Sequence, residues 1–198
     1  MARILLVLPM LWLGLLGRSQ NVDIRLLQHI HTPHYTQSDD AFRWVTNTTT
    51  FVSLGIPAGM LAIGWLKNDS TTLHNALVIT ASYAITGAIS LSLKYATNRP
   101  RPFDAYPQLF QKKTDGGSPS FPSGHSSLAF ATATSLSLQY PRWYIIVPSY
   151  LWAGTVAYSR MHLGVHYPSD VLMGAFIGSA SAYLSYKANL WLHKKYKK

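Results

Sequence analysis

The sequence contains no cysteine and no glutamate. The lack of cysteine excludes a disulfide framework, thiolate catalysis and a cysteine-ligated zinc site. All seven acidic residues are aspartates, which excludes a mechanism that needs a glutamate base or a glutamate-rich dimetal site. Charged residues are also scarce, at 12% of the chain, whereas soluble domains carry about 25%. This deficit predicts contact with lipid or an unusually dry helical interior.

The remaining composition fits one domain of 198 residues, 48% of them hydrophobic. The mean hydropathy of +0.08 is low for a protein made mostly of lipid-facing helices, so composition alone leaves a membrane and a soluble protein open. The net charge of +10 suits an anionic membrane surface, an anionic substrate or a nucleic acid. Orientation charge on a membrane protein produces the same excess. We expect a membrane and an anionic substrate as partners, and no nucleic acid.

The N-terminus carries Arg3 followed by an apolar run over residues 4–17. A run of this length is typical of a signal-peptide core and is short for a spanning helix. Residues 1–19 are therefore predicted to be a signal peptide or signal anchor, with cleavage favoured over retention. In either case the residues that follow face away from the cytoplasm.

Residues 20–50 are predicted to form an amphipathic outer segment. Three histidines lie close together here, His29, His31 and His34. Their spacing fits no firm metal-ligand template, so we expect surface or headgroup-level histidines and no metal site.

Apolar residues with helical character dominate the rest of the chain. Residues 51–190 are predicted to be the catalytic helical domain, and residues 191–198 a basic C-terminal tail. Gly174 and Gly178 allow close helix approach, as in membrane bundles. The fold class is predicted to be all-α, an antiparallel helical bundle that is embedded in a membrane and has its active site at one end. Several segments are shorter than about 18 residues, which keeps a soluble bundle open. The five helical stretches are 51–66, 75–93, 126–139, 143–158 and 171–190.

An up-and-down bundle separates the connections into two groups. The turns at 67–69 and 141–142 and the basic tail share one end, while 94–125, 159–170 and residue 50 share the other. The positive-inside rule places the first end in the cytoplasm. The site is then expected on the periplasmic or exterior face of the inner membrane in a bacterial-type cell envelope. The long connection at 103–120 is either a substrate-facing flap or a solvated loop.

Three unpaired cations follow the second of these stretches: Lys94, Arg99 and Arg101. Asp104 is the only acid between residues 70 and 114. Such cations contact lipid headgroups or bind a phosphate, since an arginine fork and a lysine point charge complement a multi-oxygen anion.

A second cluster, Ser123, Gly124 and His125, leads directly into an apolar helix. Ser123 is a natural N-cap, and Gly124 lets a ligand approach the backbone. Free N–H groups at a helix start form an anion site. An ordinary helix cap with an incidental histidine is the alternative.

A third cluster contains Arg160, His166 and Asp170. Pro168 fits the first turn of a helix, so Asp170 can accept from one ring nitrogen of His166 and leave the other free as a nucleophile. His162 is the rival nucleophile, but no downstream acid has the same spacing from it. We interpret His162 as structural.

Together these clusters resemble the three-part signature of the type 2 phosphatidic acid phosphatase superfamily, which also contains bacterial non-specific acid phosphatases and vanadium haloperoxidases. Lys94 is followed by Arg101-Pro102. The Pro122–His125 motif comes next, and Ser159-Arg160 then precedes the His166/Asp170 pair. Every signature position matches, in order, over residues 94–170.

The resemblance implies a role for each matching position. His166, oriented by Asp170, would attack phosphorus and form a phosphohistidine, while His125 would protonate the leaving oxygen and then activate water. No metal and no cofactor are implied. The implied phosphate-binding residues are Lys94, Arg101, Ser123, Gly124 and Arg160.

The implied function is metal-independent hydrolysis of lipid phosphate esters. Lipid A phosphate and undecaprenyl pyrophosphate are the favoured substrates, with phosphatidate-type lipids as further candidates. A soluble periplasmic acid phosphatase is the alternative, and a vanadate-dependent haloperoxidase is remote because the chain is short for an enclosed halide pocket. Simple binding of anionic lipid explains the charge but leaves the His125, His166 and Asp170 set unexplained. The sequence does not indicate an oligomeric state.

Overall fold

The computed structural model describes residues 21–196, and the predicted signal segment at 1–19 lies outside them. A first helical segment covers 21–30. No strand occurs between residues 21 and 196, and the all-α prediction is confirmed. The helices that follow are α2 (Gln37–Leu66), α3 (Ser70–Thr97), α4 (Pro102–Ala105), α5 (Gly124–Gln139), α6 (Trp143–His162) and α7 (Pro168–Tyr196).

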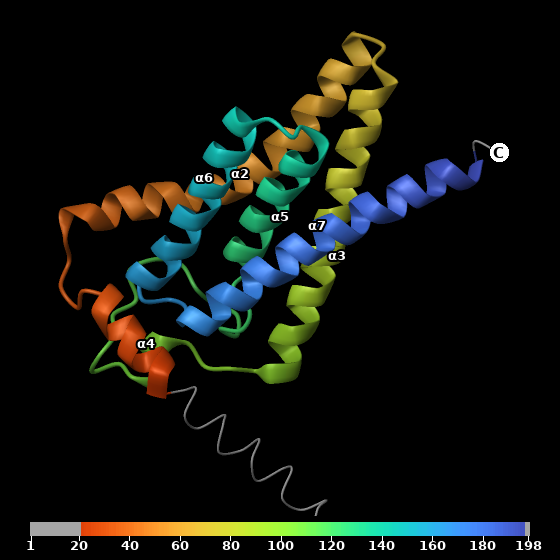
Figure 1. Ribbon diagram of the computed structural model, residues 1–198. Helices are drawn as coiled ribbons and strands as arrows, with labels where there is room; N and C mark the ends of the chain where they lie inside the picture. The colour runs from red at the N-terminus through yellow and green to blue at the C-terminus, as the bar shows by residue number, and fades with distance from the viewer. Residues whose placement is uncertain (1–20, 197–198) are drawn as a thin grey trace, which may run out of the picture.

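Helix α5 lies at the centre of the bundle and contacts α2, α3, α6 and α7 (Figure 1). Short turns join α2 to α3 and α5 to α6 at one end. The long connection from α3 to α5, with α4 inside it, lies at the other end beside the α6–α7 loop. The predicted two-ended arrangement of connections is therefore present.

Helix α2 begins at Gln37, and the prediction that this helix starts at 51 was wrong. A capping box between Thr36 and Asp39 fixes the start. The stretch before residue 51 has the polarity of a loop, but its polar side chains face the bundle: Asp39, Thr46 and Thr49 are all buried. Residue 50 consequently lies inside a helix and not at the site end.

The large apolar side chains point outward. Phe51 on α2, Leu77 on α3, Leu151 on α6 and Phe176 on α7 are all more than half exposed. Within residues 21–196, two stretches are long and apolar enough to cross a membrane, Gln37–Leu66 and Ser70–Ala105. The 30 residues of α2 extend over about 45 Å, beyond the roughly 30 Å of a hydrocarbon core.

Small and hydroxyl-bearing side chains fill the interior instead. The hydroxyl oxygens of Ser53 on α2 and Thr132 on α5 lie 3.0 Å apart. Those of Ser82 on α3 and Ser135 on α5 lie 3.1 Å apart. Interhelical hydroxyl contacts and close packing of small residues are the means by which helices associate in lipid. Large apolar residues outside and small polar residues inside indicate a bundle that faces lipid.

Gly174 and Gly178 bring α7 against α5. A Cβ at Gly178 would lie 2.0 Å from the carbonyl oxygen of Ser127, and one at Gly174 would lie 2.6 Å from that of Ser123. These obstacles are backbone atoms, so the two helices can approach this closely only with glycine at both positions. The predicted close approach through small residues is confirmed.

The substitution Gly178→Ala should destabilise the protein because α7 must move away from α5. Overpacking of this kind costs about 1–3 kcal/mol, and a thermal unfolding scan in detergent should show a lower midpoint. Gly154→Ala on α6 is the matched control, because nothing lies within 4 Å of its added methyl group. Equal midpoints for the two variants would contradict the packing described.

Candidate active site

The three sequence clusters meet around one cavity of about 270 Å³. Six of the eight predicted site residues line this cavity. Of the other two, Ser123 caps the helix that begins at Gly124, and Asp170 contacts His166. Its lining is Lys94, Arg101, Asp115, Gly116, Gly117, Ser118, Gly124, His125, Arg160 and His166.

His166 is buried, with 1% of its surface exposed. Its Nδ1 lies 3.4 Å from Oδ2 of Asp170, and its Nε2 lies 3.3 Å from NH1 of Arg101. A guanidinium can only donate, so Nε2 is the acceptor and Nδ1 carries the hydrogen. The Nε2 lone pair therefore faces the cations of the cavity.

Burial also lowers the pKa of His166 to about 4, and the neighbouring carboxylate of Asp170 only partly opposes this shift. The ring is neutral at pH 7. A neutral imidazole with its Nε2 lone pair directed into the cavity is chemically suited to attack an electrophile.

Asp170 is fully buried and is held by more groups than His166 alone. Its Oδ2 also accepts from the Tyr167 amide at 2.9 Å and from the Ser120 hydroxyl. Its Oδ1 accepts from NH1 of Arg99 at 2.6 Å. The contacts of Ser120 and Arg99 with this carboxylate were not predicted from the sequence.

The cations of the cavity are held by backbone carbonyls. Arg101 donates from Nε to the Ser118 carbonyl at 2.8 Å and from NH1 to the Val165 carbonyl at 2.7 Å, and Lys94 donates to the Pro119 carbonyl. Neither side chain has a carboxylate partner within salt-bridge distance among the described residues. Carbonyl oxygens position these cations without cancelling their charge.

Arg160 has a donor to spare. NH1 donates to the Thr46 hydroxyl at 3.0 Å and NH2 to the Asp115 carbonyl at 2.9 Å, while Nε is buried without a hydrogen-bond partner. An unsatisfied buried donor is costly. A ligand oxygen in the cavity would remove that cost.

Ser123 performs the predicted cap. Its Oγ accepts from the Ser126 amide at 3.5 Å and from the Ser126 hydroxyl at 3.0 Å. Gly124 and His125 form the first turn of α5, where amides have no partner within the helix. The half-buried His125 ring makes no hydrogen bond to another described side chain or backbone group, so it is available to a ligand.

The connection 103–120 contributes one wall of the site. Residues 115–118 line the cavity, and a Cβ at Gly116 would lie 2.8 Å from NH1 of Arg101. Lys113 anchors the segment by donating to Asp39 at 2.7 Å from a position that is 6% exposed. The sequence left two alternatives for this connection, a substrate-facing flap and a solvated loop. An anchored segment that lines the cavity matches the substrate-facing alternative.

Asp39 also pairs with His162, whose Nε2 lies 2.8 Å from Asp39 Oδ1. This agrees with the structural interpretation of His162. His31 is 4% exposed and places Nδ1 2.8 Å from the His162 carbonyl, while its Nε2 accepts from the Gln111 amide. The expectation of a surface histidine was therefore wrong for His31, because the 21–36 segment packs onto the end of α6.

A helical bundle with a histidine, three cations and a helix start at one cavity is characteristic of a phosphate-handling protein. The chain belongs to the PAP2 superfamily, whose family model matches residues 75–194. This confirms the resemblance identified in the sequence.

The chain is similar to one solved structure and to two curated relatives in particular. The crystal structure of Aquifex aeolicus LpxE superposes with a TM-score of 0.70 at 25% identity, over 82% of this chain and 93% of that one. The Lipid A 1-phosphatase of Rhizobium johnstonii is 34% identical over 69% of this chain and 58% of its own length. The Undecaprenyl-diphosphatase of Sulfolobus acidocaldarius is 31% identical over 55% and 52%. The chain thus spans about half the length of these two curated relatives.

The neutral state of His166 can be tested by NMR titration of labelled imidazoles in detergent, with His166→Gln used to assign the signal. Because burial disfavours the imidazolium, the ring should remain neutral down to about pH 4. A midpoint near the ordinary histidine value of about 6.5 would contradict the burial and pairing described.

Proposed function

We propose that this protein is a membrane-bound, metal-independent lipid phosphate phosphatase that works through a phosphohistidine. One observation carries the proposal: the Nε2 lone pair of His166 faces Arg101 in a cavity that Lys94 and Arg160 also line, and none of these three cations has a carboxylate within salt-bridge distance among the described residues. Phosphoryl transfer requires above all that charge on the equatorial oxygens be stabilised. Lys94, Arg101 and Arg160 supply that charge without a metal ion.

In the first step, the phosphate oxygens take the donors of the cavity, including the spare Nε of Arg160 and the amides at the start of α5. Arg101 then donates to phosphate, and the Nε2 lone pair of His166 is free to attack phosphorus. The new N–P bond forms as the P–O bond to the lipid breaks. His125 gives its proton to the leaving oxygen, and Asp170 stabilises the positive charge on His166.

In the second step, His125 takes a proton from water, and the resulting hydroxide attacks phosphorus. The N–P bond breaks, inorganic phosphate leaves and neutral His166 is restored. Burial and the neighbouring cations, Arg160 above all, lower the pKa of His125 to about 3. The negative charge of a bound phosphate opposes this shift and favours the protonated form that the first step needs.

A lipid substrate is supported by the surface beside the site. Lys94 lies in the last turn of α3 and lines the cavity. Leu91 and Tyr95 on the same part of the helix are 54% and 71% exposed. An acyl chain lying along this apolar surface would bring its phosphate to Lys94.

Among lipids, lipid A phosphate is our first candidate and undecaprenyl diphosphate the second. The similarity to the Rhizobium Lipid A 1-phosphatase supports the first, and the similarity to the Sulfolobus Undecaprenyl-diphosphatase supports the second. A soluble phosphatase acting on small esters is disfavoured by the outward-facing large apolar side chains on four helices.

The site is proposed to face the periplasm or exterior. Exposed cations gather at the opposite end of the bundle: Lys67, Arg142, Lys187 and Lys194. At the site end, Lys94, Arg101 and Arg160 belong to the cavity. Arg43, Arg99 and Lys113 are paired with aspartates, which leaves Arg25 and Lys112 as the exposed cations there among the described residues. The positive-inside rule therefore assigns the opposite end to the cytoplasm.

A phosphate-release panel tests the function. Purified protein in detergent is given lipid A, undecaprenyl diphosphate, phosphatidate and a soluble aryl phosphate, with chelator present throughout. We expect the fastest release from lipid A and loss of all release in His166→Ala, because this variant lacks the proposed nucleophile. Undiminished hydrolysis by His166→Ala would overturn the mechanism, and preference for the soluble ester would overturn the lipid assignment.

Arg160→Lys tests the anion site separately. A lysine point charge cannot reproduce the planar fork that reaches Thr46, Asp115 and the cavity together. We expect kcat/KM to fall by about 10²- to 10³-fold, the usual effect of losing one donor to a transition-state oxygen. Near-normal activity would show that Arg160 is only structural.

A further inference from the structure

Arg99 is a partly buried cation, with 20% of its side chain exposed, that the proposed mechanism does not use. Its guanidinium donates to both Asp170 and Asp23, at 2.6 and 2.8 Å. It also donates to the Ser169 hydroxyl at 2.7 Å and stacks over the Tyr167 ring, 4.0 Å from the centroid. These contacts hold the guanidinium between the two carboxylates and the Tyr167 ring.

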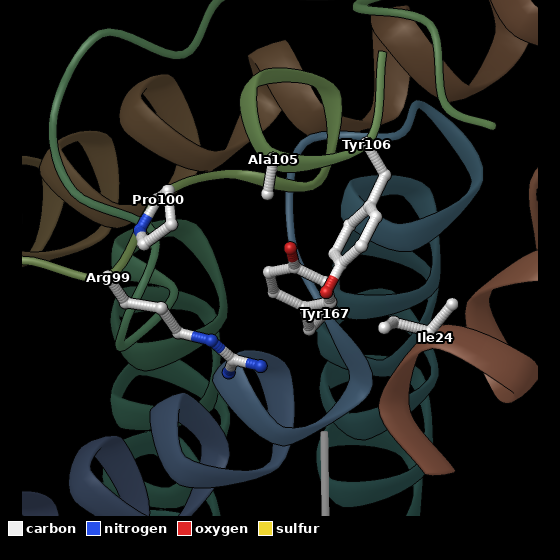
Figure 2. A pocket seen from close by; sticks show the side chains of 6 residues that line it. All are labelled: Ile24, Arg99, Pro100, Ala105, Tyr106 and Tyr167. Carbon is white, nitrogen blue, oxygen red and sulfur yellow. The ribbon is translucent and has the colours of Figure 1, made fainter. Parts of the chain in front are cut away.

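The backbone delivers Arg99 to this place. Helix α3 ends at Thr97, and Asn98 adopts a left-handed conformation with φ of 43° that turns the chain. Figure 2 shows the Arg99 side chain extending from beside Pro100 toward the start of α7, past the ring of Tyr167. The Arg99 carbonyl also accepts from the Ser120 amide at 2.8 Å, and the hydroxyl of Ser120 donates to Asp170.

The two oxygens of Asp170 therefore have separate partners. Oδ1 accepts from Arg99, while Oδ2 accepts from the Tyr167 amide and faces Nδ1 of His166. A carboxylate held at Oδ1 cannot rotate away from the histidine. The distance of 3.4 Å between His166 Nδ1 and Asp170 Oδ2 is long for a hydrogen bond. The orientation of Asp170 therefore decides whether this hydrogen bond can shorten.

Asp23 holds Arg99 from the other side. Its Oδ2 accepts from Arg99, and its Oδ1 accepts from the Ser169 amide in the first turn of α7 at 2.9 Å. Asp23 belongs to the helical segment 21–30, 146 residues away from Ser169. This segment is thus tied directly to the helix start that carries Asp170.

We propose that Arg99 and Asp23 are positioning residues for catalysis: they form a clamp that orients Asp170 toward His166. The proposal rests on the proposed phosphatase function. Arg99 acts through Asp170 and does not touch the phosphate, since it lies outside the lining of the catalytic cavity and borders a separate cavity of about 140 Å³. In this arrangement the first helical segment is part of the catalytic architecture.

Arg99→Ala should lower kcat by about 10- to 100-fold, as loss of an outer partner of a functional histidine generally does, with little change in KM. Inhibition by orthovanadate, a phosphate analogue, should be nearly unchanged because Lys94, Arg101 and Arg160 remain. Arg99→Lys should recover only part of kcat, because a lysine point charge cannot reproduce the planar fork that reaches Asp170 and Asp23 together. A parallel loss of kcat and vanadate binding would indicate general damage to the site and overturn the clamp.

Asp23→Asn supplies a milder variant, since the amide oxygen can still accept from the Ser169 amide while the charge that holds Arg99 is gone. It should lower kcat in the same sense, and the double variant with Arg99→Ala should be no worse than Arg99→Ala alone. Arg25→Ala, an exposed position on the same segment, is the matched control and should keep wild-type kcat. Additive losses in the double variant would contradict the clamp.

NMR titration of His166 separates this proposal from the proposed function. Without Arg99 the Asp170 carboxylate can turn away from His166 and stabilises the imidazolium less, so the pKa of His166 should fall further in Arg99→Ala; Arg101 and Arg160 are the other charged groups near the ring. This readout needs no substrate. A protein that releases no phosphate but shows the fall would sink the phosphatase and keep the clamp; an active protein in which the pKa of His166 does not fall and kcat is unchanged would sink the clamp alone.

Discussion

The site depends on the pairing and hydrogen bonding of one buried carboxylate, that of Asp170. A charge with no exposed surface must be paired and hydrogen-bonded to be tolerated, and the partners of Asp170 come from three different segments. Arg99 follows α3, Ser120 precedes α5, and His166 and Tyr167 precede α7. Satisfying this one carboxylate therefore joins the three motifs at a single cavity.

The bundle makes such a site compatible with lipid. Its interior consists of small and hydroxyl-bearing residues, while the large apolar side chains face outward. Gly174 and Gly178 let α7 approach α5 closely enough to bring Asp170 beneath the start of α5, where the Ser123 amide donates to the Asp170 carbonyl at 3.0 Å. Helix packing in the membrane region thus sets the geometry at the end of the bundle.

The predicted site followed from residue types that have few other uses. Lys94 and Arg160 lack acidic neighbours in the sequence, Arg101 has only Asp104 nearby, and Asp170 follows His166 at one helical turn. The all-α fold followed from the apolar stretches. Both predictions depend on local patterns, which a single sequence displays directly.

The start of α2 and the Arg99 clamp depend on long-range partners and were not predicted. Asp39 looks like a loop residue until Lys113 and His162 are placed beside it, 74 and 123 positions later. Arg99 likewise reads as an unpaired cation, because Asp23 lies 76 positions earlier. No periodicity in the sequence encodes such pairings.

Trapping the phosphoenzyme tests the central claim most directly. His125→Ala is mixed with a radiolabelled aryl phosphate, whose good leaving group needs no acid, and is quenched in alkali for peptide mapping by mass spectrometry. The account predicts that label accumulates on His166, because water attack on the intermediate has lost its base. Continued release of phosphate with no label on His166 would contradict it.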